Sequence, residues 1–349
     1  MLIVDDSAFM RRVAAQIIES SGEFVVAGTA RNGVDGLEQV RKLDPDIVTL
    51  DVDMPEMDGL TALHHIMSEA PRPVVMLSAG TTTGGQEATL RALELGAVDF
   101  VLKPSGSISL DLVVIADRLL GALRGAVTAT IGGEQPVLTS GAPIYRPAHR
   151  TAPPATHCVV IAASTGGPRA LAAVMPRVPG SLGAAVLIVQ HMPAGFTKSL
   201  AHRLDRVSPL PVSEAVAGEP VVRGRAYIAP GGFHMSVIRD GNGPIIALDQ
   251  TPPIWGVRPA ADILFKSAAS IFGAGTLAVV LTGMGRDGAA GTLAVRQAGG
   301  LALIQDRETA TIFGMPHAAL EHAGADRIVA LADVGSAIAE LVDAVRNVP

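Results

Sequence analysis

Ser164 ends an apolar run in CVVIAASTGGPRAL, residues 158–171, and two glycines follow it closely. Serine in this setting suits three kinds of chemistry. It is a favoured helix N-cap, it can belong to a phosphate-binding loop, or it can act as a nucleophile. A phosphate loop needs Lys-Ser or Lys-Thr after its last glycine, or a G-x-G-x-x-G spacing, and neither is present. A serine at a strand-to-helix turn lies near a positive helix N-terminus, and backbone N–H groups there can face an oxyanion. We therefore favour the nucleophile.

A serine nucleophile needs a base, and the base needs an orienting partner. His191 follows the next apolar run in VLIVQHMPAGF, and Asp287 follows another in AVVLTGMGRDGAAG. The carboxyl ends of parallel strands share one sheet edge, so Ser164, His191 and Asp287 can meet there. Two further histidines compete as the base: His234 begins a predicted strand and His202 lies on a predicted helix. Asp287 taken alone fits a helix N-cap equally well.

The first half of the chain offers a second set of strand-end residues. Asp5 and Asp6 end the first apolar run, Asp51 ends the third, Ser78 the fourth and Lys103 the fifth. Converging carboxylates need a cation, and Mg²⁺ suits oxygen ligands. With Mg²⁺ held by Asp5, Asp6 and Asp51, the last of these could accept a phosphoryl group. A single Asp at a strand end is more often a turn former or cap.

The elements that would position these residues alternate along the chain. In the first half we predict strands at 2–5, 24–30, 46–51, 73–78 and 97–103, with helices at 8–20, 33–42 and 59–67 between them. Such alternation predicts a parallel sheet with helices on both faces. About five strand-helix units end near residue 124.

Alternation resumes in the second half. Strands are predicted at 157–164, 184–191, 225–230, 234–239, 276–283 and 301–306, which indicates a second doubly wound, mostly parallel α/β domain. Residues 125–156 between the two halves are rich in Ala, Thr, Gly and Pro without periodicity, which is typical of a linker.

Composition narrows the classes of function. The 349 residues favour two domains, and the net charge of −6 makes nucleic acid a poor candidate as partner. The one cysteine suits a reducing cytoplasm. No apolar run is long enough to cross a bilayer, and the N-terminus turns acidic after four residues, so we expect no signal peptide.

The motifs IVDDSAFMRR, TLDVDMPEMDGL, VVMLSAG and ALELGAVDFVLKPSG resemble the receiver domain of two-component response regulators, over residues 1–124. The resemblance implies a flavodoxin-like (βα)5 fold and phosphorylation of Asp51 by a histidine kinase, with Mg²⁺ held at Asp5 and Asp6. It also implies that Ser78, Phe100 and Lys103 read the phosphorylation. Receivers usually have a few more residues before VDD, so the start codon is assigned late or the first strand is weakened.

The motifs IAASTGGPRAL, QHMPAGFTKSLAHRLD, YIAPGGFHM, RPAADILFKSAA, LTGMGRDGAAG and QDRETATIFGMPHAA resemble the catalytic domain of the chemotaxis protein-glutamate methylesterases. The resemblance implies a Rossmann-like catalytic domain at 157–349 behind the linker at 125–156. It implies a catalytic triad of Ser164, His191 and Asp287, with Thr165 and Met284 beside the reacting carbonyl. RPAAD departs from the family, which more often has Ser and Val between Pro and Asp.

Together the two resemblances imply a cytoplasmic esterase, activated by phosphorylation, that hydrolyses glutamate γ-methyl esters on methyl-accepting chemoreceptors and deamidates selected receptor glutamines. The esterase chemistry would need no cofactor, and contact with the membrane would come only through the receptors. Two alternatives stay open: a catalytically inactive, phospho-dependent adaptor, and a DNA-binding regulator, which the acidic charge disfavours.

Overall fold

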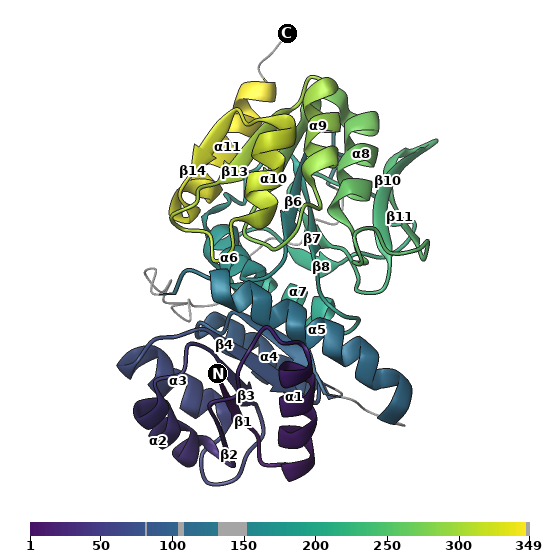
Figure 1. The fold of residues 1–349 in the computed structure, drawn as a ribbon. Coiled ribbons are helices and arrows are strands. Elements are labelled where there is room, and N and C mark those ends of the chain that lie inside the picture. The colour runs from purple at the N-terminus through teal and green to yellow at the C-terminus, as the bar shows by residue number, and fades with distance from the viewer. Residues whose placement is uncertain (81, 104–107, 132–151, 347–349) are drawn as a thin grey trace. The chain divides into compact units, whose positions relative to one another are not determined.

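The computed structural model describes residues 1–80, 82–103, 108–131 and 152–346, and the chain divides into two compact units, Met1–Gln135 and Pro136–Pro349. Each unit is an α/β layer structure, as the alternating pattern predicts (Figure 1). Within the described residues, none of the helices combines the length and apolar content needed to cross a bilayer.

The first unit alternates five strands with five helices in chain order. Its elements are β1 (Leu2–Val4), α1 (Ala8–Ser20), β2 (Gly28–Ala30), α2 (Gly33–Leu43), β3 (Val48–Asp51), α3 (Gly59–Glu69), β4 (Val74–Ser78), α4 (Thr83–Glu94), β5 (Asp99–Leu102) and α5 (Ile108–Thr128). All strand pairs are parallel, in the order β2-β1-β3-β4-β5. β2 lies on one side of β1, and β3, β4 and β5 follow on the other side. The strand order therefore reverses between β1 and β3, and open sheets bind ligands at such a position.

One core of the first unit lies between the sheet and two helices. Ala14 and Ile18 of α1 and Leu119 and Leu123 of α5 are buried against the strands. The strand predicted over 24–30 is shorter than expected, because β2 begins only at Gly28 and Val25 is 78% exposed. Valine favours strands because its side chain packs against neighbours on a half-buried sheet surface, and the exposed Val25 side chain lacks this packing.

The second unit is built on a larger parallel sheet. Its elements are β6 (Cys158–Ala163), α6 (Gly167–Val174), η1 (Met175–Arg177), β7 (Ala185–Gln190), α7 (Phe196–Val207), β8 (Val212–Glu214), β9 (Ala226–Ile228), β10 (His234–Asp240), β11 (Gly243–Asp249), α8 (Ala261–Phe272), η2 (Gly273–Gly275), β12 (Thr276–Val280), α9 (Ala289–Gln297), β13 (Leu301–Gln305), α10 (Gly314–Ala323), β14 (Arg327–Val329), η3 (Leu331–Asp333) and α11 (Val334–Arg346).

Seven of these strands form one parallel sheet in the order β14-β13-β12-β6-β7-β9-β8. β6 comes first in the chain. β7, β8 and β9 lie on one side of it, and the later strands β12, β13 and β14 lie on the other side. The order therefore reverses at β6 and β12, which marks the expected binding edge. The strand predicted at 234–239 forms instead as β10 of a separate antiparallel pair with β11.

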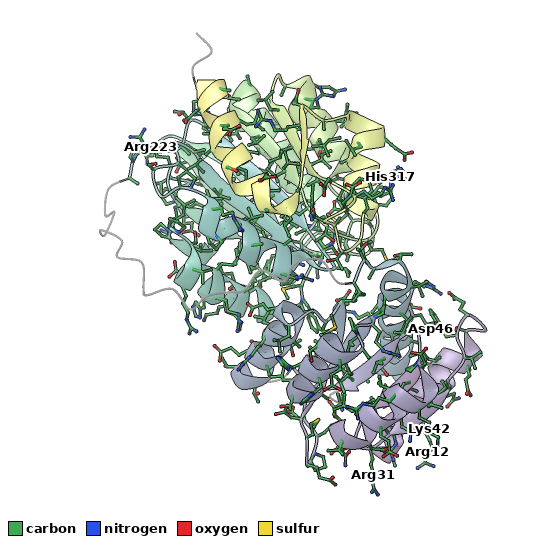
Figure 2. All side chains as sticks on the ribbon, turned by 90° about the vertical axis from the view of Figure 1, so that its left-hand side faces the viewer. Arg12, Arg31, Lys42, Asp46, Arg223 and His317 are labelled. Carbon is green, nitrogen blue, oxygen red and sulfur yellow. The ribbon has the colours of Figure 1, made fainter. Side chains whose placement is uncertain are left out.

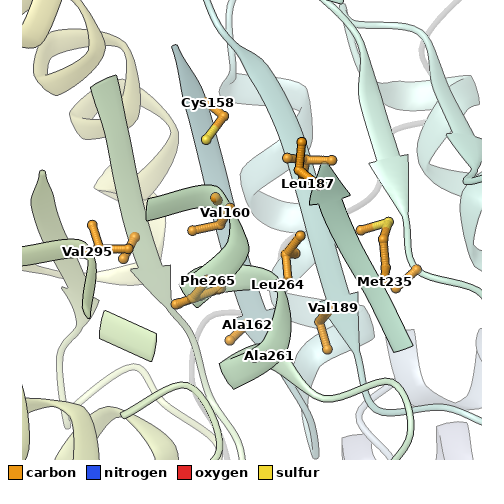
Figure 3. Packing of buried hydrophobic residues seen from close by; sticks show 14 of the residues in the cluster. Cys158, Val160, Ala162, Leu187, Val189, Met235, Ala261, Leu264, Phe265 and Val295 are labelled. Atoms are coloured by element: carbon orange, nitrogen blue, oxygen red, sulfur yellow. The ribbon is translucent and has the colours of Figure 1, made fainter. Parts of the chain in front are cut away.

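The core on one face of this sheet joins β6 and β7 to helix α8. Figure 3 shows Val160 and Ala162 of β6 and Leu187 of β7 beside Leu264 and Phe265 of α8, all fully buried. Burying a side chain of this size stabilises the fold by about 1.5–3 kcal/mol. This packing fixes the start of α8 near the carboxyl end of β6.

The stretch predicted as a linker, 125–156, lies largely outside the described residues. Its two described ends belong to packed structure: α5 continues to Thr128, and Ala155 is buried with its N–H donating to Val221 O at 2.9 Å. Residues at both ends of this stretch are therefore packed against the neighbouring units.

Candidate active site and phosphorylation site

Ser164 follows β6 directly and lies on the turn into α6. Its N–H donates to Thr282 O (3.0 Å), and its carbonyl accepts from Gly167 N (2.7 Å). The N-cap of α6 is Gly166, at a φ of 76° that favours glycine, and no side chain caps the helix. The simplest interpretation of Ser164, helix capping, is therefore wrong, since the hydroxyl is not used for this purpose.

His191 occupies the matching position on the neighbouring strand. Ala163 and Gln190 are paired in the β6–β7 ladder, so Ser164 and His191 are the next residues on each strand, and His191 N donates to Ala163 O (3.1 Å). The buried Gln190 amide donates to the carbonyls of Ser164 (2.9 Å) and His191 (3.3 Å). This amide holds the two strand ends together. Sequence reasoning missed it, although a glutamine inside an apolar strand was a signal.

Asp287 contacts His191 from the loop that follows β12. The His191 Nε2 atom lies 2.8 Å from Asp287 Oδ2, and only 9% of the histidine side chain is exposed. Asp287 also accepts from the backbone N–H groups of Ala261 (2.6 Å), Asp262 (3.0 Å) and Gly288 (3.0 Å). The predicted partners His191 and Asp287 are thus in contact, with Ser164 on the adjacent strand end.

The charge of Asp287 is stabilised although the side chain is 2% exposed. Burial raises the pKa of this carboxyl, but the hydrogen bond and charge of His191 and the N–H groups of Ala261 and Asp262 outweigh burial and leave the pKa below its ordinary value. The N–H groups belong to the first turn of α8, whose dipole favours an anion. An ionised Asp287 keeps the proton on His191 Nε2, which leaves Nδ1 as the basic nitrogen.

The competing histidines lie elsewhere. His234 is fully buried; its Nδ1 accepts from Ala260 N (3.1 Å) and its Nε2 lies 3.2 Å from Pro252 O. Both ring nitrogens are therefore occupied by backbone, and the side chain is structural. His202 is exposed on α7.

The two residues expected beside the reacting carbonyl lie on the neighbouring turns. Thr165 follows Ser164, and its carbonyl accepts from Thr282 Oγ1 at 3.0 Å. Met284 is 45% exposed on the loop between β12 and Asp287. Thr165 borders Ser164 as the next residue in the chain. Met284 follows Gly283, and Gly283 approaches Ser164 so closely that a Cβ on the glycine would lie 2.8 Å from the Ser164 Cβ.

In the first unit three carboxylates converge at the edge between β1 and β3. Ligand oxygens of Asp5, Asp6 and Asp51 all lie within 4.8 Å of one another. Lys103 Nζ is 2.8 Å from Asp5 Oδ2 and 2.7 Å from Asp51 Oδ2. Burial raises the pKa of Asp51 to about 6, aided by the charges of Asp5 and Asp6 and opposed by Lys103. One lysine does not neutralise three carboxylates, and the remaining negative charge and hard oxygen donors fit Mg²⁺.

The two other residues expected to read phosphorylation lie on the strands beside this cluster. Ser78 is buried at the end of β4, where Thr89 Oγ1 lies 2.8 Å from its hydroxyl oxygen. Phe100 is half-buried on β5, paired with Met76 of β4.

Both halves of the chain match known protein families. Residues 159–338 match the family described as CheB methylesterase, and residues 1–114 match the response regulator receiver domain. A protein-glutamate methylesterase/protein-glutamine glutaminase of Pyrococcus abyssi is 45% identical over 352 residues, covering 99% of this chain and 94% of the relative. A protein of the same name from Geobacillus kaustophilus is 46% identical, with 98% of each chain covered. The crystal structure of the Thermotoga maritima CheB methylesterase catalytic domain matches with a TM-score of 0.52 and 44% identity, over 53% of this chain and 98% of that chain.

Proposed function

This chain belongs to the CheB methylesterase family and carries a response regulator receiver domain before the catalytic domain, and we propose that it hydrolyses glutamate γ-methyl esters on chemoreceptors under control of phosphorylation. It also deamidates selected receptor glutamines, consistent with the glutaminase named in its relatives. The observation that carries the proposal is the His191–Asp287 pair at the sheet edge where Ser164 ends the adjacent strand.

The proposed chemistry uses the three side chains in sequence. His191 Nδ1 removes the Ser164 proton as the serine Oγ bonds to the ester carbonyl carbon. His191 then gives that proton to the departing methoxide, and methanol leaves an acyl-enzyme. Water, deprotonated by His191, attacks the acyl carbon, and the C–O bond to Ser164 breaks as His191 returns the proton to the serine oxygen, which releases glutamate and restores the enzyme. In the glutaminase reaction ammonia leaves in place of methanol.

The negative charge that develops on the ester carbonyl oxygen must be stabilised by hydrogen-bond donors. The turn at Ser164 and Thr165 leads into the N-terminus of α6, where backbone N–H groups and the helix dipole favour an anion. One such donor is worth on the order of 10²–10³ in rate. Met284, exposed on the loop before Asp287, would supply an apolar contact to the ester.

In the receiver domain, Asp51 is the proposed phosphoacceptor. Asp5, Asp6 and Asp51 would hold Mg²⁺, which neutralises charge on the phosphoryl oxygens when bound. Lys103 would pair with the phosphorylated Asp51, and Ser78 and Phe100 would respond to the phosphorylation. The proposed arrangement is a receiver domain at 1–124, a linker at 125–156 and a catalytic domain at 157–349.

The proposed partners follow from the two domains. A chemotaxis histidine kinase supplies the phosphoryl group, and a methyl-accepting chemoreceptor is the protein substrate. The proposal places the enzyme in the cytoplasm, in contact with the membrane only through receptors, and involves no nucleic acid, in keeping with the net charge of −6.

The test is methanol release from membranes holding methylated chemoreceptor, with and without a small-molecule phosphodonor plus Mg²⁺. We expect release that is abolished by Ser164→Ala and that rises with phosphodonor only when Asp51 is present. His202→Ala, on an exposed helix face, is the matched control for His191→Ala. A wild type that releases no methanol and takes no fluorophosphonate on Ser164 would overturn the proposal in favour of an inactive adaptor.

A further inference from the structure

Trp255 occupies a backbone conformation that a bulky residue rarely adopts. Ile254 and Val257 exchange N–H···O bonds of 3.1 and 3.0 Å, and the two residues between them have positive φ, 54° at Trp255 and 78° at Gly256. Turns with positive φ at both central positions favour Asn, Asp and Gly. Trp255 is 57% exposed, so burial does not offset this strain. Strain of this kind points to a function for the side chain.

The indole is held in place by its two neighbours. Trp255 Nε1 donates to Asp262 Oδ2 (3.2 Å), and the guanidinium carbon of Arg286 lies 5.0 Å from the centroid of the ring. Asp262 in turn accepts through Oδ1 from Gly288 N (3.1 Å). The stacked Trp255 and Arg286 are therefore fixed directly beside Asp287.

Arg286 carries a charge that the rest of the described chain does not neutralise. The residue is exposed, and across the described residues its guanidinium meets the Trp255 ring and no carboxylate. Stacking uses the flat face of the guanidinium, and the N–H donors on its edge stay available to a carboxylate. The ring therefore limits the motion of an exposed cation that is available to a carboxylate of another molecule.

Apolar side chains border the same edge. Met284 is 45% exposed two residues before Arg286, and Phe233 is 36% exposed. The loop of Phe233 is joined to the Trp255 turn, because Gly232 N donates to Arg258 O (3.2 Å). One cation among exposed apolar groups suits a substrate segment that is apolar on one side and carries a carboxylate next to the reacting ester.

We propose that Arg286, positioned by Trp255, is a specificity-determining residue that pairs with a substrate carboxylate adjacent to the glutamyl ester. The inference rests on the proposed function and names its preferred substrate: a methyl glutamate flanked by unmethylated acidic residues. Each hydrolysis creates a new carboxylate, so removal of one ester makes a neighbouring ester a better substrate.

The test compares two forms of one substrate: receptor membranes with a single methylated glutamate whose neighbouring acidic residues are Glu, or are both replaced by Ala. The ratio of the two kcat/KM values for methanol release by the full chain is measured. We expect the wild type to favour the acidic form about fivefold, the gain expected of a partly exposed ion pair. Arg286→Glu should bring the ratio below one, and Trp255→Gly should bring it close to one.

Arg223→Glu is the matched control. It makes the same charge change at an exposed arginine before β9, at the amino edge of the sheet, and it projects from the surface in Figure 2. Its ratio should stay at the wild-type value. A wild-type ratio of one, or an Arg286→Glu ratio equal to the wild type, overturns this inference and leaves the esterase proposal intact. Absence of methanol from both forms overturns the two together.

Discussion

Asp287 binds the N-terminus of α8, the helix that contains Asp262, and Asp262 binds the N-terminus of α9, the helix that follows Asp287. Asp287 accepts from Ala261 N and Asp262 N in the first turn of α8, and Asp262 accepts from Gly288 N (3.1 Å) and Gly291 N (2.7 Å) at the start of α9. The N-caps of these helices, Ala260 and Gly288, supply no side-chain bond. The proposed partner of His191 is thus fixed by a reciprocal capping arrangement.

Asp262 should therefore act as a positioning residue. Asp262→Ala leaves Gly288 N and Gly291 N without this acceptor and loosens the loop of Asp287. We expect kcat for methanol release to fall about tenfold with little change in KM, since a displacement of 1 Å can cost up to about 10²-fold in rate. Asp262→Asn keeps an acceptor oxygen and should recover most of kcat. Equal losses in the two variants would contradict the positioning role.

The raised pKa of Asp51 predicts a pH-dependent stability of the receiver. Its pKa is about 6 in the folded protein and about 3.9 in an unfolded chain. Between these values the folded state binds more protons, so the free energy of unfolding falls as pH rises from about 4 to about 6. Asp51→Asn removes this loss, so its Tm should exceed that of the wild type above pH 6 and not at pH 4.

Calorimetry of the full chain at several pH values checks this. Added Mg²⁺ at pH 7 should raise the wild-type Tm and leave that of Asp51→Asn unchanged, because the ion offsets the carboxylate repulsion. Asp53→Asn, which removes an exposed carboxylate of the same loop, should follow the wild type. A Tm difference that is the same at pH 4 and pH 7 would refute the assignment.

The sequence predicts the architecture and the place of both sites because the relevant signals are local. Apolar runs ending in Ser164, His191 or Asp51 are strands, and topology brings the ends of parallel strands to one edge. The contact of His191 with Asp287 was open to prediction for this reason, although 96 residues separate them.

The remaining features depend on tertiary contacts or on weak patterns. β8 and β14 have three residues each, too few for a periodic signal, and β11 was missed beside β10. The turn at Trp255 lacks the residues that favour positive φ at its first central position. The capping pair of Asp262 and Asp287 was out of reach, because an acceptor on one helix satisfies the N-terminus of another.

Tyr227 gives a prediction about stability alone. Its ring is fully buried on β9, its hydroxyl donates to Pro220 O (2.8 Å), and Val222 N donates to that hydroxyl (3.1 Å). Tyr227→Phe keeps the ring and removes both hydrogen bonds, which should cost about 1 kcal/mol because Pro220 is exposed and Val222 is half-buried. Chemical denaturation measures this. Ser236→Ala removes a hydroxyl that makes no hydrogen bond within the described residues and should cost much less; equal costs would count against the Tyr227 bonds.

Gly231 links the stability of one loop to the geometry of the active site. A Cβ at this position would collide with the backbone of Pro193 and Ala194, two and three residues after His191. Gly231→Ala must push these loops apart and displace the histidine, so we expect kcat/KM for methanol release to fall about 10- to 100-fold. Gly241→Ala, in the β10–β11 turn with nothing within 4 Å of its Cβ, is the control and should keep full activity. If Gly231→Ala retains wild-type kcat/KM while its Tm falls, the close approach of the loops serves folding and does not position His191.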